Sequence, residues 1–143
     1  CDINYFVTEY LNCYLTYAYL DAEDKTSNTD LPTQPRHKVH AGIYYSLWNS
    51  QLKWFLDLFY ASERSRYFWD ASYRYEEKAE DYFLVNTTIR LENVLYSNFH
   101  VSLTINNLLY ERYKRQNYVI DSNEIDDFER TGISFYLKGT LKI

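Results

Sequence analysis

The sequence predicts an all-β chain: an antiparallel up-and-down meander of about seven strands that forms a section of a transmembrane β-barrel. Three observations predict it. Apolar and polar residues alternate along successive stretches, the links between these stretches are alternately short and long, and tyrosine is unusually frequent, with 17 Tyr in 143 residues. Barrels of the bacterial outer membrane combine alternating strands, short turns on one side, longer loops on the other and aromatic rings at both interfaces.

Alternation with a period of two residues is clearest in the second half of the chain. In residues 83–92, 99–106 and 133–143 one parity is almost wholly apolar and the other is mostly polar. This is the pattern of a β-strand whose two faces have different surroundings. Residues 38–47 and 52–61 repeat it, with aromatic residues mixed into the polar parity.

Weaker alternation occupies the stretches 3–8 and 11–19, which completes the seven predicted strands. Their lengths are close to the roughly 9–11 residues of a tilted transmembrane strand.

The links between the strands are of two kinds. Short links are expected at 9–10, 48–51 and 92–98, and long polar links at 21–37, 62–81 and 108–131. Alternation alone also fits a soluble sandwich, but three long links on one side favour a barrel. Within the second long link, residues 67–75 could hold an additional strand or hairpin.

Composition and charge narrow the class of protein. The net charge of −5 argues against a nucleic-acid-binding protein, and no apolar run approaches the roughly 18 residues of a membrane-spanning helix. Cys1 and Cys13 form neither a disulfide framework nor a metal-binding spacing. The chain has no Met and no signal peptide, and an odd strand number is unusual for a bacterial barrel, so we expect a piece of a longer protein.

No catalytic constellation is visible, so we expect no enzyme and no cofactor. His37 and His40 have no cysteine or carboxylate cluster nearby in the sequence, so no metal site is expected there. His100 and Ser102 share the polar parity of one strand. We interpret them as part of a polar wall and not as a hydrolytic pair.

Three stretches, taken in order, resemble the C-terminal part of TonB-dependent outer-membrane receptors. In that family, the first stretch corresponds to a strand that runs into an external loop. The second corresponds to the exit from that loop, and the third to the segment before the last external loop. The stretches are Tyr17-Ala18-Tyr19-Leu20-Asp21-Ala22, Pro35-Arg36-His37-Lys38-Val39, and Ile105-Asn106-Asn107-Leu108-Leu109-Tyr110 followed by Tyr113. The resemblance extends over nearly the whole chain in order and spacing.

This resemblance implies that residues 1–143 are the C-terminal segment of an outer-membrane barrel, with the plug domain and the upstream strands outside the chain. It implies uptake of a scarce nutrient, such as an iron-siderophore, haem, cobalamin or a glycan, across the bacterial outer membrane. The implied partners are outer-membrane lipid, the plug domain and remaining strands, the small-molecule ligand, and an inner-membrane energising complex that acts through the absent N-terminal region. No nucleic acid is expected.

Two sets of residues are candidate sites. Aromatic and arginine side chains of the second long link suit ligand capture by stacking and charge; these are Arg64, Arg66, Tyr67, Trp69, Tyr73 and Tyr75. Polar-parity residues of the strands are expected to face the lumen and the plug domain; these are Lys53, Asp57, Arg90, His100 and Lys138.

Two alternatives remain open at this point. The chain could be a self-contained eight-stranded outer-membrane barrel acting as an adhesin or pore, which requires an eighth strand within 62–81 and pairing of the first strand with the last. It could instead be a lipid-anchored soluble β-sandwich or lipocalin-like binding module built on Cys1, which requires the apolar parity to pack inward.

Overall fold

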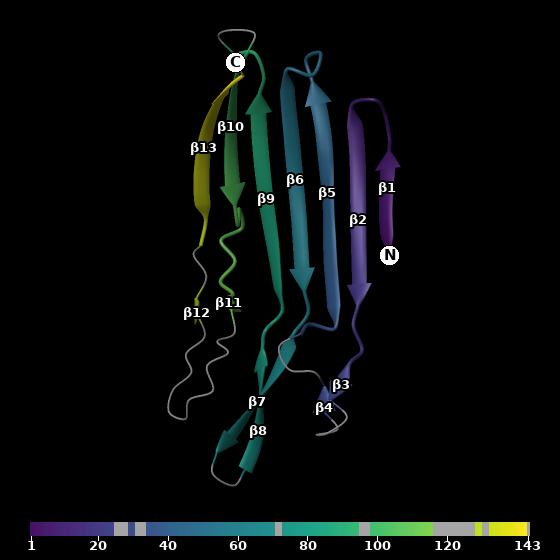
Figure 1. Cartoon of the computed structure of the whole chain (residues 1–143), viewed down its shortest axis with the longest axis vertical. Coiled ribbons are helices and arrows are strands. Elements are labelled where there is room, and N and C mark those ends of the chain that lie inside the picture. The colour runs from purple at the N-terminus through teal and green to yellow at the C-terminus, as the bar shows by residue number, and fades with distance from the viewer. Residues whose placement is uncertain are drawn as a thin grey trace.

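A computed structural model describes residues 1–24, 29–30, 34–70, 73–94, 98–115, 128–129 and 132–142. Seven strands form one antiparallel sheet in the order β1-β2-β5-β6-β9-β10-β13 (Figure 1). This confirms the predicted meander. The strands are β1 (Asp2–Phe6), β2 (Leu11–Tyr19), β5 (His37–Leu47), β6 (Leu52–Ala61), β9 (Tyr82–Leu91), β10 (Phe99–Asn106) and β13 (Ser134–Leu141).

The first strand is shorter than predicted, because a turn begins before Thr8. The backbone N–H of Val7 donates to the Leu11 carbonyl oxygen at 2.9 Å. The Thr8 hydroxyl oxygen accepts from the backbone N–H groups of Tyr10 at 3.2 Å and Leu11 at 3.0 Å. A short hydroxyl side chain that bonds nearby backbone groups stabilises a turn in place of a sheet ladder. The strand therefore ends at Phe6.

The second short turn, between β5 and β6, has an unusual backbone. Trp48, Asn49 and Ser50 adopt φ angles of 50°, 51° and 66°, and the N–H of Gln51 donates to the Trp48 carbonyl oxygen at 3.0 Å. Asn tolerates this left-handed region better than most residues, whereas Trp does not. Trp48 is 70% exposed at this end of the sheet.

The long connections gather at the opposite end of the sheet, where three small two-stranded sheets lie (Figure 1). They are β3 (Glu23–Asp24) with β4 (Thr29–Asp30), β7 (Arg64–Asp70) with β8 (Tyr73–Ala79), and β11 (Lys114–Arg115) with β12 (Phe128–Glu129). The β7–β8 pair is the hairpin considered for residues 67–75. It pairs with itself and adds no strand to the main sheet.

The main sheet is open. β1 and β13 lie at its two edges, and among the described residues no ladder joins them. A self-contained eight-stranded barrel would need that ladder and an eighth strand in the sheet, and the described strands supply neither.

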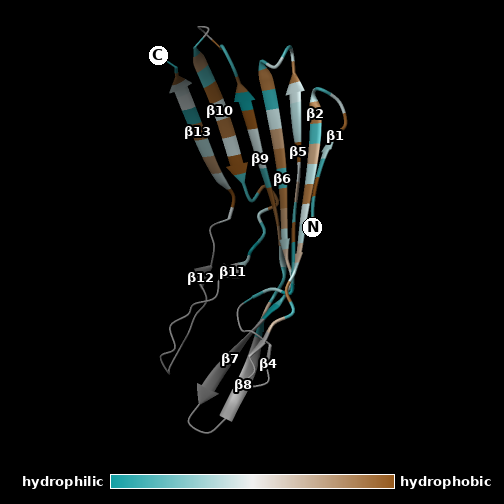
Figure 2. Cartoon of the chain, turned by 45° about the vertical axis from the view of Figure 1, so that its right-hand side comes forward, coloured by the Kyte–Doolittle hydropathy of each residue, from teal (hydrophilic) through white to brown (hydrophobic). Residues whose placement is uncertain are grey.

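The strand register keeps one chemical character on each face. Along the polar face, Tyr14 pairs with Gly42, Gly42 with Asp57, and Asp57 with Asn86. One position along each strand, Leu15, Ala41, Leu58 and Val85 form the matching row of the opposite face. Figure 2 shows the resulting bands of hydrophilic and hydrophobic residues along the strands.

Each face of the sheet comprises alternate residues of every strand. The polar face comprises the parity of Asn12, Tyr14, Lys38, His40, Tyr44, Lys53, Asp57, Phe59, Tyr82, Asn86, Thr88, Arg90, His100, Ser102, Thr104, Tyr136 and Lys138. The apolar face comprises the parity of Leu11, Leu15, Val39, Ile43, Trp54, Leu56, Leu58, Val85, Thr87, Ile89, Val101, Leu103, Ile105, Phe135, Leu137 and Leu141.

No element of the described ranges packs as a second layer against the apolar face. Among the described residues only Ala61 and Val85 are buried hydrophobic residues, whereas Phe135 is 61% exposed and Leu137 is 77% exposed. A sandwich or lipocalin-like module would bury this parity inside, so that alternative lacks its core. The described ranges also contain no helix long and apolar enough to span a bilayer.

Two polar side chains on the apolar face, Trp54 and Thr87, are hydrogen-bonded within the sheet. The Trp54 indole N–H donates to the Thr87 hydroxyl oxygen at 2.8 Å, and that hydroxyl donates to the Phe55 carbonyl oxygen at 3.0 Å. Because an unpaired polar group is costly in an apolar environment, this pairing lets Trp54 and Thr87 lie among hydrophobic neighbours.

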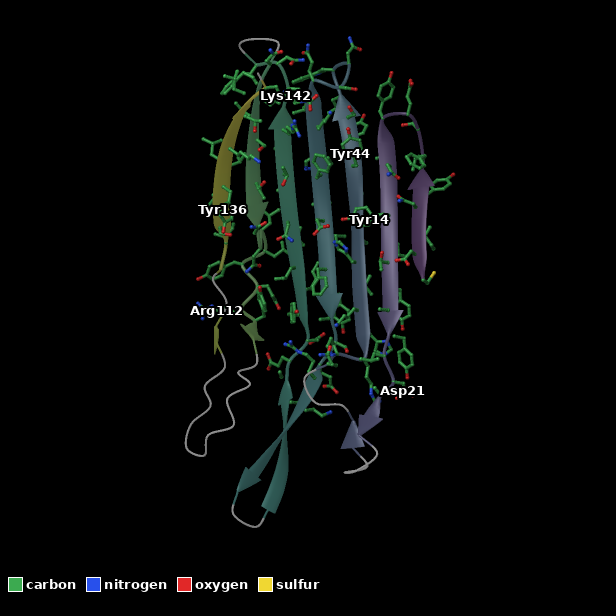
Figure 3. All side chains as sticks on the ribbon, in the orientation of Figure 1. Tyr14, Asp21, Tyr44, Arg112, Tyr136 and Lys142 are labelled. Carbon is green, nitrogen blue, oxygen red and sulfur yellow. The ribbon has the colours of Figure 1, made fainter. Side chains whose placement is uncertain are left out.

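Gly42 of β5 makes room for the ring of Tyr14. A Cβ atom at position 42 would lie 2.5 Å from Cζ and Oη of Tyr14 and 2.6 Å from the Leu56 carbonyl oxygen. The Tyr14 side chain, which Figure 3 labels between β2 and β5, therefore crosses β5 at the glycine and reaches Asp57 on β6.

We predict that Gly42→Ala lowers the free energy of unfolding by about 1–3 kcal/mol, because the added methyl group displaces the Tyr14 ring and presses on backbone. Gly139→Ala is the matched control, since its Cβ would meet the Phe99 ring at 3.4 Å, an ordinary contact. Denaturant unfolding of the full-length protein in detergent measures both. Equal losses for the two variants would contradict a specific role for the space above Gly42.

Candidate functional site

Asp57 is the centre of a hydrogen-bonded cluster on the polar face. Its Oδ1 accepts a hydrogen bond from the Tyr14 phenol and lies 2.7 Å from Nε2 of His40. Its Oδ2 accepts from the Asn86 amide at 3.4 Å. The cluster therefore joins four adjacent strands, β2, β5, β6 and β9, through one carboxylate.

The cluster continues through Asn86 to the end of β10. The backbone N–H of Asn107 donates to Oδ1 of Asn86 at 3.0 Å. The Asn107 side chain accepts from the Glu111 N–H and donates to the Glu111 carbonyl oxygen, both at 2.8 Å. Asn107 is buried and adopts a φ of 53°, a conformation that Asn tolerates. Asn107 lies in the third stretch that resembles TonB-dependent receptors. Its hydrogen bonds to Glu111 stabilise the first turn of the long connection after β10.

A second, ionic cluster lies near the short-turn end of the polar face. One oxygen of Glu92 is 2.9 Å from Nζ of Lys53 and 3.3 Å from a guanidinium nitrogen of Arg90. The hydrogen bond from Lys53 lowers the pKa of the Glu92 carboxyl, and the charges of Lys53 and Arg90 act in the same direction against burial. A lowered pKa means that this stabilisation is present above the ordinary carboxyl pKa and is lost as the pH falls through the lowered value.

His100 lies next to this ionic cluster and contributes to lowering the pKa of Glu92. The imidazole is buried, and neither ring nitrogen has a hydrogen-bond partner among the described residues. A buried imidazole normally finds a partner. His100 is thus a polar group that this sheet alone does not satisfy.

Aromatic rings gather at the long-connection end of the polar face. Centroids of Phe59 and Tyr82 are 5.8 Å apart, and the rings of Tyr82 and Tyr113 stack at 4.6 Å with an interplanar angle of 19°. The guanidinium carbon of Arg64 lies 5.3 Å from the centroid of Tyr82. We call Phe59, Tyr82, Tyr113 and Arg64 the aromatic strip. It is an electron-rich surface with an adjacent cation.

The residues predicted for ligand contact are only partly brought together. Arg64 joins the aromatic strip. The other five occupy β7 and β8, where the backbone alone is described; these are Arg66, Tyr67, Trp69, Tyr73 and Tyr75. Sequence reasoning missed Phe59, Tyr82 and Tyr113, although the aromatic residues mixed into the polar parity of residues 52–61 were the signal for Phe59.

The five residues predicted to face the lumen all lie on the polar face, in separate groups. Asp57 is in the four-strand cluster, Lys53 and Arg90 are in the ionic cluster, and His100 lies beside it. Lys138 lies apart on β13, exposed and paired in register with Ser102. The sequence did not predict that His40 and Asp57 meet, because they belong to different strands.

The sequence profile described as "TonB dependent receptor-like, beta-barrel" matches residues 2–108. The chain belongs to this family. The match confirms the resemblance drawn from the three short stretches. By sequence, no curated protein matches the chain.

Solved structures of TonB-dependent receptors share the fold of the chain. FpvA of Pseudomonas aeruginosa bound to a heterologous ferric pyoverdine superposes with a TM-score of 0.80 at 13% identity over 98% of this chain and 18% of FpvA. The FpvAI–pyocin S2 complex gives 0.78 at 13% identity with the same coverage. The ferric enterobactin receptor PfeA of P. aeruginosa gives 0.78 at 16% identity over 98% of this chain and 21% of PfeA.

The chain therefore spans between 18% and 21% of the length of these receptors. One of them is described as the ferripyoverdine receptor of the outer membrane. The two faces of this sheet are therefore compared with the two faces of a TonB-dependent receptor barrel wall.

We predict that Asn107→Gly loosens the 107–111 turn. Glycine keeps the left-handed backbone but removes both hydrogen bonds to Glu111, at a cost of about 1–3 kcal/mol of local stability. Hydrogen exchange at the Glu111 amide of the full-length protein measures the loss. Asn106→Gly, whose side chain takes no part in these contacts, controls for the added backbone freedom. Unchanged exchange at Glu111 in Asn107→Gly would contradict this stabilisation of the turn.

Proposed function

We propose that this chain is part of the barrel wall of an outer-membrane receptor that takes up a small anionic iron chelate of the siderophore class. The aromatic strip with Arg64 is the observation that carries this proposal. The proposal has three parts. The apolar face supports the contact with the membrane, the charges on the polar face support the contact with a plug domain, and the aromatic strip supports the class of ligand.

The membrane part of the proposal starts from the apolar face. In the described part of the chain no second layer covers this face, and Phe135, Leu137 and Leu141 on it are exposed. The indole N–H of Trp54 is paired with Thr87, as lipid requires of a polar group that it covers. Residues 1–143 would then be the C-terminal segment of a barrel in the bacterial outer membrane. Upstream strands of the parent chain would pair with β1 and β13 and remove the two edges.

The polar face would line the lumen of that barrel and contact a plug domain. Lys53 and Arg90 share the single carboxylate of Glu92, and Lys138 adds a further exposed cation. This part of the face therefore carries more positive than negative charge, which suits acidic groups on the plug. A plug that fills the lumen could also supply a partner for His100. An inner-membrane energising complex would act through the region before this chain.

The ligand part of the proposal rests on chemistry at the long-connection end. Stacked tyrosines bind flat aromatic groups, and an arginine beside them balances negative charge. Ferric pyoverdine and enterobactin are the ligands named for the structurally similar FpvA and PfeA. Haem, cobalamin and glycans are the competing classes, and a direct binding comparison separates them from a siderophore.

We predict that Tyr82→Ala and Tyr113→Ala each weaken siderophore binding about tenfold, because each removes one ring of the stacked pair. The measurement is equilibrium binding of ferric catecholate and pyoverdine-type siderophores, haem, cobalamin and oligosaccharides to the full-length receptor. Tyr44→Ala is the control, since Tyr44 lies on the same face, nearer the short-turn end, against Phe55 at 4.8 Å (Figure 3). Preferential binding of haem, cobalamin or a glycan would overturn the ligand class.

A second prediction tests the two faces. Leu103→Arg, near the middle of β10, is expected to cost about 2–4 kcal/mol of stability in a bilayer, because it puts a charge in lipid. Ser102→Arg, one residue earlier on the polar face, is expected to cost much less. Unfolding of the full-length protein in phospholipid vesicles measures both. A greater loss for Ser102→Arg would reverse the assignment of the faces.

A further inference from the structure

Three chemically different side chains converge above Gly42 on the polar face. The phenol of Tyr14 comes from β2, the imidazole of His40 from β5 and the carboxylate of Asp57 from β6. We propose that Tyr14, His40 and Asp57 form a binding site for a ferric ion. The site is distinct from the aromatic strip, and the proposal does not depend on which ligand that strip binds.

The donor atoms of the three side chains lie within hydrogen-bonding distance of one another. Nε2 of His40 lies 2.7 Å from Oδ1 of Asp57 and 3.5 Å from Oη of Tyr14, and the phenol is hydrogen-bonded to the same carboxylate oxygen. Neighbouring ligands of an octahedral ion with bonds of about 2.0–2.1 Å are separated by about 3 Å. Binding of one ion by all three donors would replace the hydrogen bonds among these side chains with bonds to the ion.

The donor set selects the ion. Carboxylate and phenolate oxygens are hard ligands, and imidazole is a common iron ligand. Tyrosine oxygen is a known ligand of ferric iron, whereas Zn²⁺ is usually held by Cys, His, Asp and Glu. When the ion binds, the Tyr14 O–H bond breaks, its proton passes to solvent, and the phenolate oxygen bonds to iron. The phenolate and the carboxylate then neutralise two of the three positive charges.

The surroundings hold these donors in place and leave them accessible. Gly42 provides the space over which Tyr14 crosses β5. The amide of Asn86 donates to Oδ2 of Asp57, which leaves Oδ1 turned toward His40 and Tyr14. Such an outer hydrogen bond orients a ligating carboxylate.

The site is also open to the polar face. In this sheet the His40 and Asp57 side chains are 46% and 34% exposed, which leaves room on the polar face for water or chelator oxygens to complete the coordination of an ion. The His40 ring also lies 6.3 Å from Phe59, at the margin of the aromatic strip. An ion held here would lie next to the surface proposed for the siderophore.

Metal-free full-length receptor in detergent, titrated with ferric nitrilotriacetate, tests the site. We expect the wild type to develop the visible absorption band of an iron-bound phenolate at one equivalent of iron. Tyr14→Phe should abolish the band, and Asp57→Asn should weaken iron binding at least about tenfold. Tyr44→Phe, which removes a phenol from the same face outside the site, should retain it.

Absence of the band in the wild type, or its persistence in Tyr14→Phe, would overturn the proposal. Circular dichroism of the same preparations confirms that each variant is folded. Siderophore binding is measured on them as a second readout. It also separates the two proposals, because Tyr14→Phe should bind the siderophore with unchanged affinity. Loss of siderophore binding in Tyr14→Phe would instead assign Tyr14 to the siderophore surface and overturn a separate ferric site.

Discussion

Strand register is the constraint on which the rest of this structure depends. Side chains alternate between faces with a period of two, so a slip of one residue in any ladder would exchange the polar and apolar faces. The observed pairing of Tyr14, Gly42, Asp57 and Asn86 keeps one polar row intact across four strands. It brings His40 and Asp57 together from positions that are 17 residues apart.

Much of the fold could be predicted from local pattern, because alternation is a property of neighbouring residues. The seven strands, their order and the end at which the long connections lie were all predictable. The end of the first strand was not, since it depends on the Thr8 side chain bonding nearby backbone. The aromatic strip was also missed, because the stacking of Tyr82 on Tyr113 depends on where the chain returns after β10. Local sequence pattern does not specify where the segment after β10 lies relative to β9.

Several polar side chains of this sheet form hydrogen bonds with residues of the neighbouring strand, whereas His100 finds no such partner among the described residues. Thr88 and Thr104 bond each other at 2.9 Å across β9 and β10, while Trp54 uses Thr87 on the other face. Thr88, Thr104, Trp54 and Thr87 therefore need no second layer to provide their hydrogen-bond partners. This explains how a structure with so few buried hydrophobic residues keeps a defined register.

The two open edges of the sheet have a practical consequence for handling this protein. Among the described strands, β13 pairs on one side only, and it carries three exposed hydrophobic residues, Phe135, Leu137 and Leu141. An unprotected edge of this kind pairs readily with another chain, so an isolated 143-residue peptide would tend to form aggregates or edge-to-edge multimers. Self-association of such a peptide would reflect the edges of β1 and β13, which lack a pairing strand in the described part of the chain. Biochemical experiments are therefore better carried out on the complete receptor.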